Sequence, residues 1–283
     1  QTGTNGTAEV NQTSDPSNDS TLMASINQIS GDMNWAKITQ SDDRNTASIT
    51  QEGAGNNESE ILQDSDGSAL GEARDNTATN SQNGDGNTSY IEQRQLNHTA
   101  TVSQSGDNNA SEVDQEGDTN SATVNQFGIG GHFSDVTQTG NNNAAFVDQG
   151  LDNNSSVVVQ DGEDNEAIVD QTGVSGQSVV VNQSGTDNDG NLTDTGDENS
   201  STILQMGALN DADVWQFGDD NLSLIEQDGM SNDADVTQGS DDNMSTILQM
   251  GDGNMANVDQ SATDGNMSKI MQNGSGNMAT VTQ

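Results

Sequence analysis

Acidic residues recur at a fixed spacing in the C-terminal half of the sequence. Asp197, Asp219 and Asp241 are 22 residues apart, and Asp220 and Asp242 directly follow the last two. If this spacing is a structural period, like charges stack about 5 Å apart, where they repel one another and attract a counter-ion. Carboxylate oxygens suit a hard cation, so these five residues are candidates for a Ca²⁺ site. The alternative is a solvated acidic edge that suits high salt and holds no cofactor.

Other residue types that could do chemistry lack the partners that such chemistry needs. His98 and His132 stand in a slot that asparagine usually fills, and the chain has two histidines and no cysteine, so a transition-metal site is not expected. The recurring serines have no accompanying base, which a serine nucleophile requires. The sequence therefore predicts no enzyme activity and no disulfide.

A single glutamine recurs every 11 or 12 residues along most of the chain, and Asp194 alone breaks the series. A short fixed period indicates a repeat architecture. Six residues before the glutamine stands an asparagine in most units, and we expect both residue types to form side-chain ladders between successive repeats. The predicted ladder residues are Gln12, Gln104, Gln115, Gln126, Gln205, Gln216, Gln227, Gln238, Gln249, Gln260, Gln272 and Gln283, with Asn109, Asn120, Asn221, Asn232 and Asn277.

The elements that position these residues are short β-strands. Each unit reads N-x-(A/S)-x-(V/I)-x-Q-x-G, an alternation of inward and outward residues that is typical of strands, with turn-forming Asn and Gly at its ends. The small residue alternates between Ser and Ala, so the full repeat is about 22 residues, or two strands and two turns. We predict an all-β, two-sheet β-solenoid of about 12 rungs (24 strands), one domain over residues 1–283 with loop insertions near 13–21 and 64–74.

Composition alone would suggest disorder, because only 28% of the residues are hydrophobic, 2% are aromatic and the net charge is −41. The periodicity overrules that interpretation, since a narrow core needs few apolar residues if each is placed regularly. All seven aromatic residues and all ten methionines fall at outward positions. The charge argues against nucleic-acid or anionic-membrane partners. No segment reaches the ~20 apolar residues of a membrane span.

Outward hydrophobic residues gather late in the chain. They are Leu204 and Met206, Trp215 and Phe217, and Leu248 and Met250. One interpretation is a lateral contact between fibrils. The alternative is a set of isolated exposed side chains, which are common on protein surfaces.

The repeat resembles the curlin repeat of curli, the bacterial amyloid fibre. The segment from Ser223 to Gln238 (SLIEQDGMSNDADVTQ) fits the pattern S-x-(I/V)-x-Q-x-G-x-x-N-x-A-x-V-x-Q, and so does the segment from Ser111 to Gln126. The resemblance implies a secreted, cross-β subunit of the biofilm matrix and of cell adhesion, similar to the curli major subunit but with more repeats. It also implies a nucleator subunit and an outer-membrane secretion pore as partners.

We expect the subunit to polymerise head to tail, because the repeat runs to both termini and leaves open strand edges. Prolines at Ala279 and Val281 are expected to block growth. The chain begins with Gln1, so we expect an extracellular product whose signal peptide has been removed.

Two alternatives to the major fibre subunit stay open: a minor nucleating curlin, and a monomeric solenoid that binds ice or cations. An ice-binding solenoid needs a regular outward array, usually of threonine. The outward position before the marker glutamine is instead irregular, with Asn11, Thr39, Leu62, Glu92, Asp114, Trp215 and Leu248.

Overall fold

The computed structural model describes residues 5–14, 21–64, 73–173 and 175–283. The predicted insertions near 13–21 and 64–74 fall mainly on residues 15–20 and 65–72, which lie outside the described residues. The chain groups into two compact units, residues 1–143 (unit 1) and residues 144–283 (unit 2), and each is described by itself.

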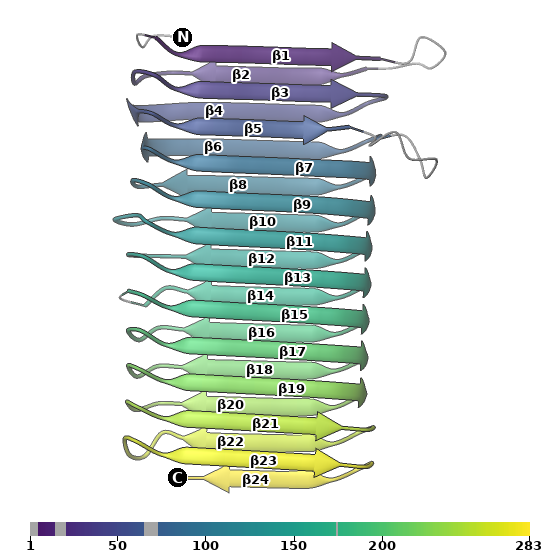
Figure 1. Cartoon of the computed structure of the whole chain (residues 1–283), viewed down its shortest axis with the longest axis vertical. Coiled ribbons are helices and arrows are strands. Elements are labelled where there is room, and N and C mark those ends of the chain that lie inside the picture. The colour runs from purple at the N-terminus through teal and green to yellow at the C-terminus, as the bar shows by residue number, and fades with distance from the viewer. Residues whose placement is uncertain (1–4, 15–20, 65–72, 174) are drawn as a thin grey trace. The chain divides into compact units, whose positions relative to one another are not determined.

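Unit 1 has two parallel sheets, and the chain passes from one to the other at each turn (Figure 1). The odd-numbered strands form one sheet: β1 (Thr7–Thr13), β3 (Trp35–Ser41), β5 (Glu58–Gln63), β7 (Thr88–Leu96), β9 (Ala110–Asp118) and β11 (Phe133–Asn141). The even-numbered strands form the other: β2 (Met23–Gln28), β4 (Thr46–Gly55), β6 (Thr77–Asp85), β8 (Thr99–Ser105) and β10 (Ser121–Gln126).

Unit 2 repeats this arrangement. Its odd sheet holds β13 (Ser155–Glu163), β15 (Ser178–Thr186), β17 (Ser200–Ala208), β19 (Leu222–Met230), β21 (Met244–Met250) and β23 (Met267–Asn273). Its even sheet holds β12 (Ala144–Gln149), β14 (Glu166–Gln171), β16 (Asp189–Asp194), β18 (Asp211–Gln216), β20 (Asp233–Gln238), β22 (Met255–Gln260) and β24 (Met278–Thr282). The described residues of the two units hold 24 strands, and the predicted all-β, two-sheet β-solenoid is confirmed.

Register is set by the repeat, so that equivalent residues of successive rungs pair. Gln126 on β10 pairs with Gln104 on β8, and Gln227 on β19 pairs with Gln205 on β17. A one-residue slip would turn every buried side chain outward. An irregularity occurs between β4 and β6, where the register shifts between Glu52 and Gly55.

The core of each unit is a thin layer between its two sheets. Its aliphatic residues, such as Ile225 and Val236, are fully buried, and so are small residues such as Ala234. Each fully buried Val or Ile stabilises the fold by roughly 1.5–3 kcal/mol. All ten methionines are exposed, as the alternation predicts. The thin layer has no space for large side chains, which therefore point outward.

The turns depend on a left-handed residue directly before the buried asparagine. Asp220 and Asp242, with φ values of 56° and 58°, precede Asn221 and Asn243. This conformation is uncommon for residues other than glycine but is more accessible to Asn and Asp. The described residues include no helix long and apolar enough to cross a membrane.

Candidate functional site

The marker glutamines form hydrogen-bonded ladders inside each unit. On the odd sheet of unit 2, Nε2 of Gln205 donates to Oε1 of Gln227 at 3.0 Å, and Gln227 donates to Gln249 at 3.0 Å. The second proton of Gln227 Nε2 goes to the backbone oxygen of Asp211 in the opposite sheet, at 2.7 Å. Each amide therefore ties its rung to the next rung and one sheet to the other.

Every glutamine predicted for the ladder lies in one of these amide chains. In unit 1, Nε2 of Gln82 donates to Gln104, and Gln104 donates to Gln126, both at 2.9 Å. The placed residues are Gln12, Gln104, Gln115, Gln126, Gln205, Gln216, Gln227, Gln238, Gln249, Gln260, Gln272 and Gln283. Because both N–H groups and the carbonyl are used, glutamine satisfies its polar atoms in a dry core.

The asparagines form a second ladder of a different kind. The Asn221 side-chain oxygen accepts the backbone N–H of Asn243 at 2.9 Å, and the Asn221 N–H donates to Asn199 Oδ1 at 2.9 Å. Asn232 also donates from Nδ2 to the backbone oxygen of Gly251 at 2.8 Å. Asparagine thus joins the turns of neighbouring rungs. The predicted Asn109, Asn120, Asn221, Asn232 and Asn277 all occupy this position.

His98 takes the place of an asparagine in unit 1. Its Nδ1 accepts the backbone N–H of Asn120 at 3.2 Å, and its Nε2 lies 2.6 Å from the backbone oxygen of Arg94. These contacts require a neutral ring with the proton on Nε2. Burial lowers the pKa of His98, against hydrogen bonds to the backbone of Arg94 and Gly117 that raise it. His132 occupies the same slot, and its backbone N–H donates to Oδ1 of Asn109 at 3.1 Å.

Asp194 interrupts the glutamine ladder of unit 2. It pairs between Gln171 and Gln216, is fully buried, and neither carboxylate oxygen has a hydrogen-bond partner in the described structure. A carboxylate cannot donate as an amide does, and Gln216 Oε1 instead accepts the Ser201 hydroxyl at 2.6 Å. Burial, followed by the charge of Asp170, raises the pKa of Asp194 well above its usual range.

The five calcium candidates hold the turns of unit 2 in a way that sequence did not predict. Asp219 and Asp241 each accept a backbone N–H of the preceding rung, from Asp197 at 2.9 Å and from Asp219 at 3.0 Å, and Asp197 accepts that of Ser175 at 2.8 Å. Asp220 and Asp242 are the left-handed turn residues. Among the described residues no group of three or more His, Cys, Asp or Glu is arranged to hold a metal. Calcium binding stays a prediction.

A denser acidic cluster, which sequence reasoning missed, lies on the outer face of the even sheet of unit 2. Pairing aligns Glu166, Asp189, Asp211 and Asp233 in one column, and Asp213 beside Asp235 in the next. Burial and then these neighbouring carboxylates raise the pKa of Asp211 to about 6. The 22-residue spacing of Asp189, Asp211 and Asp233 is the sequence feature from which this cluster could have been predicted.

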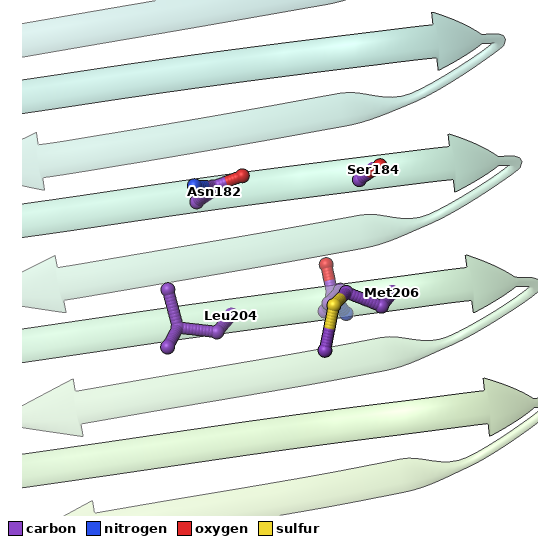
Figure 2. A pocket seen from close by; sticks show the side chains of 5 residues that line it. Asn182, Ser184, Leu204 and Met206 are labelled. Carbon is purple, nitrogen blue, oxygen red and sulfur yellow. The ribbon is translucent and has the colours of Figure 1, made fainter.

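The odd sheet of unit 2 has the opposite character. We call its apolar outer surface the Leu/Met face: Leu204, Met206, Leu222, Leu224, Met244, Leu248, Met250, Met267 and Met271. Figure 2 shows Leu204 and Met206 of β17 beside Asn182 and Ser184 of β15, where these residues line a shallow hollow. Trp215 and Phe217 lie on or directly after β18, in the other sheet. The six predicted hydrophobic residues are therefore split between two faces.

The even sheet of unit 1 carries a regular array of hydroxyl groups, which we call the hydroxyl face. Three outward positions on each of β4, β6, β8 and β10 are in register and uncharged: Thr46, Ser48, Thr50, Thr77, Thr79, Ser81, Thr99, Thr101, Ser103, Ser121, Thr123 and Asn125. The irregular array described from sequence came from odd-numbered strands, apart from Trp215 on β18, and so left out the even sheet of unit 1. Sorting outward residues by alternate strands would have found this face.

Comparison with known proteins gives a family for the repeat. Residues 97–128, 196–229, 207–239 and 229–261 match the curlin associated repeat. A comparison with curated proteins gave no match. The matched segments contain glutamine and asparagine ladder positions from each unit, and strands paired in the same way continue outside them. The repeat in these segments is therefore identified as a curlin repeat.

Proposed function

We propose that this protein is a structural subunit of an extracellular, curli-like fibre that grows by stacking solenoid rungs of successive copies. The observation that carries the proposal is the self-complementary rung. Each interior rung meets the next through the same backbone pairing and amide ladders. A rung of another copy can continue these ladders as in cross-β fibres, without new chemistry.

The outermost rungs support the proposal. Val10 on β1 is 45% exposed and Val281 on β24 is half-buried, whereas the equivalent Ile225 and Val236 are fully buried. A further rung would cover these apolar residues and satisfy the strand edge beneath it. The match to the curlin associated repeat favours a role in the biofilm matrix and adhesion. A nucleating subunit and an outer-membrane secretion pore are the partners that we propose from the same family.

The unpaired backbone groups of β24 belong to the residues whose N–H and C=O groups point away from β22. The backbone oxygen of Asn277 accepts the backbone N–H of Met255 at 2.8 Å, and the backbone N–H of Gln283 donates to the backbone oxygen of Asp259 at 2.9 Å. Asn277 and Gln283 therefore direct their backbone groups toward β22. Alternation along the strand then directs those of Ala279 and Val281 the same way, and those of Thr280 and Thr282 away from β22. Proline at Ala279 and Val281 would therefore detach β24 from β22, so a block of growth by these variants would not isolate the open edge.

The test is therefore proline at Thr280. We expect the Thr280→Pro variant to fold but to elongate filaments more slowly from the β24 end, because proline removes an N–H that an added rung needs. Electron microscopy and seeded growth would follow the filaments, and circular dichroism the fold. Thr280→Ser, which keeps the N–H, is the control. Growth of the proline variant at the wild-type rate from both ends, or no filaments from the wild-type chain, would contradict the proposal.

A second candidate function, ice binding by unit 1, is favoured by the hydroxyl face. Its hydroxyl groups repeat about every 4.8 Å across the strands and about 6.6 Å along them. A flat, uncharged array of this kind can order water, and it stands out on a chain with a charge of −41. Thermal hysteresis that Thr101→Tyr abolishes and Thr202→Tyr, on the odd sheet of unit 2, preserves would support this candidate. Absence of thermal hysteresis in the wild-type chain would remove it.

A further inference from the structure

We propose that the Leu/Met face of unit 2 is the surface through which two copies of this chain pair laterally, face to face. The face is built from columns, since Leu222, Met244 and Met267 are successive partners on β19, β21 and β23. Met250 is 43% exposed and Met267 is 69% exposed. Contiguous apolar surface of this kind on a soluble protein marks a contact. This pairing is lateral and does not depend on the stacking of rungs.

The charge distribution of unit 2 favours a second copy of this chain as the partner of the Leu/Met face. Two chains of net charge −41 repel each other over most of their surfaces. The outward positions of β17, β19, β21 and β23 carry only three charges, Glu226, Asp228 and Lys269. On the other side of unit 2, β16, β18 and β20 carry the acidic cluster. The Leu/Met face is thus the side of unit 2 on which two copies meet with least repulsion.

The three charges on this face are complementary under two-fold symmetry. Lys269, on β23, is the single lysine or arginine of residues 144–283. Glu226 and Asp228 lie on β19, and β21 lies between the two strands. A two-fold axis along β21 places β23 of each copy over β19 of the other. Lys269 then lies over Leu224, the β19 residue of its own column, and Glu226 stands two residues further along β19. Both copies also share the same strand spacing, which lets their side chains pack in register as in paired sheets.

Flexible methionine side chains suit such a contact. Met has three rotatable bonds and a polarisable sulfur, so it fills irregular gaps between packed surfaces. The face is therefore adapted to close packing against a second sheet. Sulfoxide formation would make the same side chains polar.

The test uses two methionines with matched exposure on opposite sheets. Met250, on the Leu/Met face, is 43% exposed, and Met255, on the even sheet, is 44% exposed. We expect Met250→Glu to weaken dimer formation about tenfold or more and Met255→Glu to leave it unchanged. Sedimentation velocity over a range of concentrations would measure both, in a Thr280→Pro background in which end addition is slowed. Circular dichroism would establish that each variant is folded.

A charge variant tests the symmetry. Lys269→Glu should weaken pairing most at low salt, because it replaces an attraction by a repulsion that salt screens. A chain that stays monomeric at all concentrations would overturn the proposal, and so would equal effects of Met250→Glu and Met255→Glu. Binding only to vesicles, with no dimer in buffer, would assign the face to a lipid surface instead. If dimers form but the wild-type chain forms no filaments, lateral pairing stands and rung stacking fails.

Discussion

At the marker position, the side-chain amide offers a donor and an acceptor for the neighbouring rungs and a second donor for the opposite sheet. Glutamine supplies all three, as Gln227 does with Gln205, Gln249 and Asp211. Asparagine is shorter and serves the turn, where its oxygen meets a backbone N–H. The identities of the two ladder residues therefore follow from the distances that each must span.

Replacing Asp194 by glutamine should repair the ladder of the even sheet in unit 2. The change removes a buried carboxylate without partners, so we expect a gain of about 1–3 kcal/mol in the free energy of unfolding at neutral pH. The folded-state pKa of Asp194 is raised. The free-energy cost of burying its ionised carboxylate is therefore absent in acid and grows as pH rises from about 4 through that pKa. Denaturant unfolding at several pH values would measure the gain. If the gain in the free energy of unfolding is as large in acid as at neutral pH, the buried charge of Asp194 is not its cause.

His98 makes the opposite contribution to the pH dependence. Its folded-state pKa is lowered, so stability is full above the unfolded pKa of about 6.5 and declines as pH falls below it. His98→Asn should keep the hydrogen bonds of the position and remove this decline. Comparing the unfolding midpoints of the two proteins between neutral and mildly acidic pH would test it. A wild-type decline that persists in the variant would assign the effect to other groups.

At the scale of the strand, the register places equivalent residues of successive rungs in one column. A residue repeated every 22 positions becomes a continuous stripe on one sheet, as Asp189, Asp211 and Asp233 do. The stripes differ between the two sheets of unit 2, because alternate strands contribute to opposite faces. The acidic cluster, the Leu/Met face and the hydroxyl face all arise in this way.

Neutralising the centre of the acidic column should stabilise unit 2 above pH 6. Asp211 has a folded-state pKa of about 6, raised by burial and by four neighbouring carboxylates. Its protonated form is favoured in the folded state, so the cost of the charge appears as pH rises from about 4 through 6. Asp211→Asn should therefore raise the unfolding midpoint at pH 8 and not at pH 4. A matched change at exposed Asp228, for which we expect a smaller effect, is the control.

At the scale of the whole molecule, the excess of acidic residues governs the response to salt. Five lysines and arginines cannot neutralise 46 aspartates and glutamates. Because the screening length falls from about 30 Å to about 3 Å between 0.01 M and 1 M ionic strength, we expect the protein to become more stable over this range. Thermal unfolding in NaCl would measure the change, and a midpoint independent of salt would contradict it. An added effect of Ca²⁺ at equal ionic strength would indicate specific binding.

The sequence by itself determined the fold class, the strand positions and the ladder residues. A period of two within each unit sorts residues such as Ile225 and Met230 into inward and outward sets, and the 22-residue period pairs equivalent residues of successive rungs. These features depend on local alternation and repetition, which need no knowledge of distant contacts. They also predicted that methionine and aromatic side chains would point outward.

Only the tertiary structure decided which outward residues share a face and which way each backbone group points. Trp215 follows Leu204 by one strand but belongs to the other sheet, so their apparent cluster is divided. The hydroxyl face appears only when alternate strands are brought together, and the hydrogen-bonding side of Thr280 depends on the pairing of β24 with β22. The physical reason is that the chain changes sheets at every turn. Neighbours in sequence therefore separate, while residues 22 positions apart come into contact.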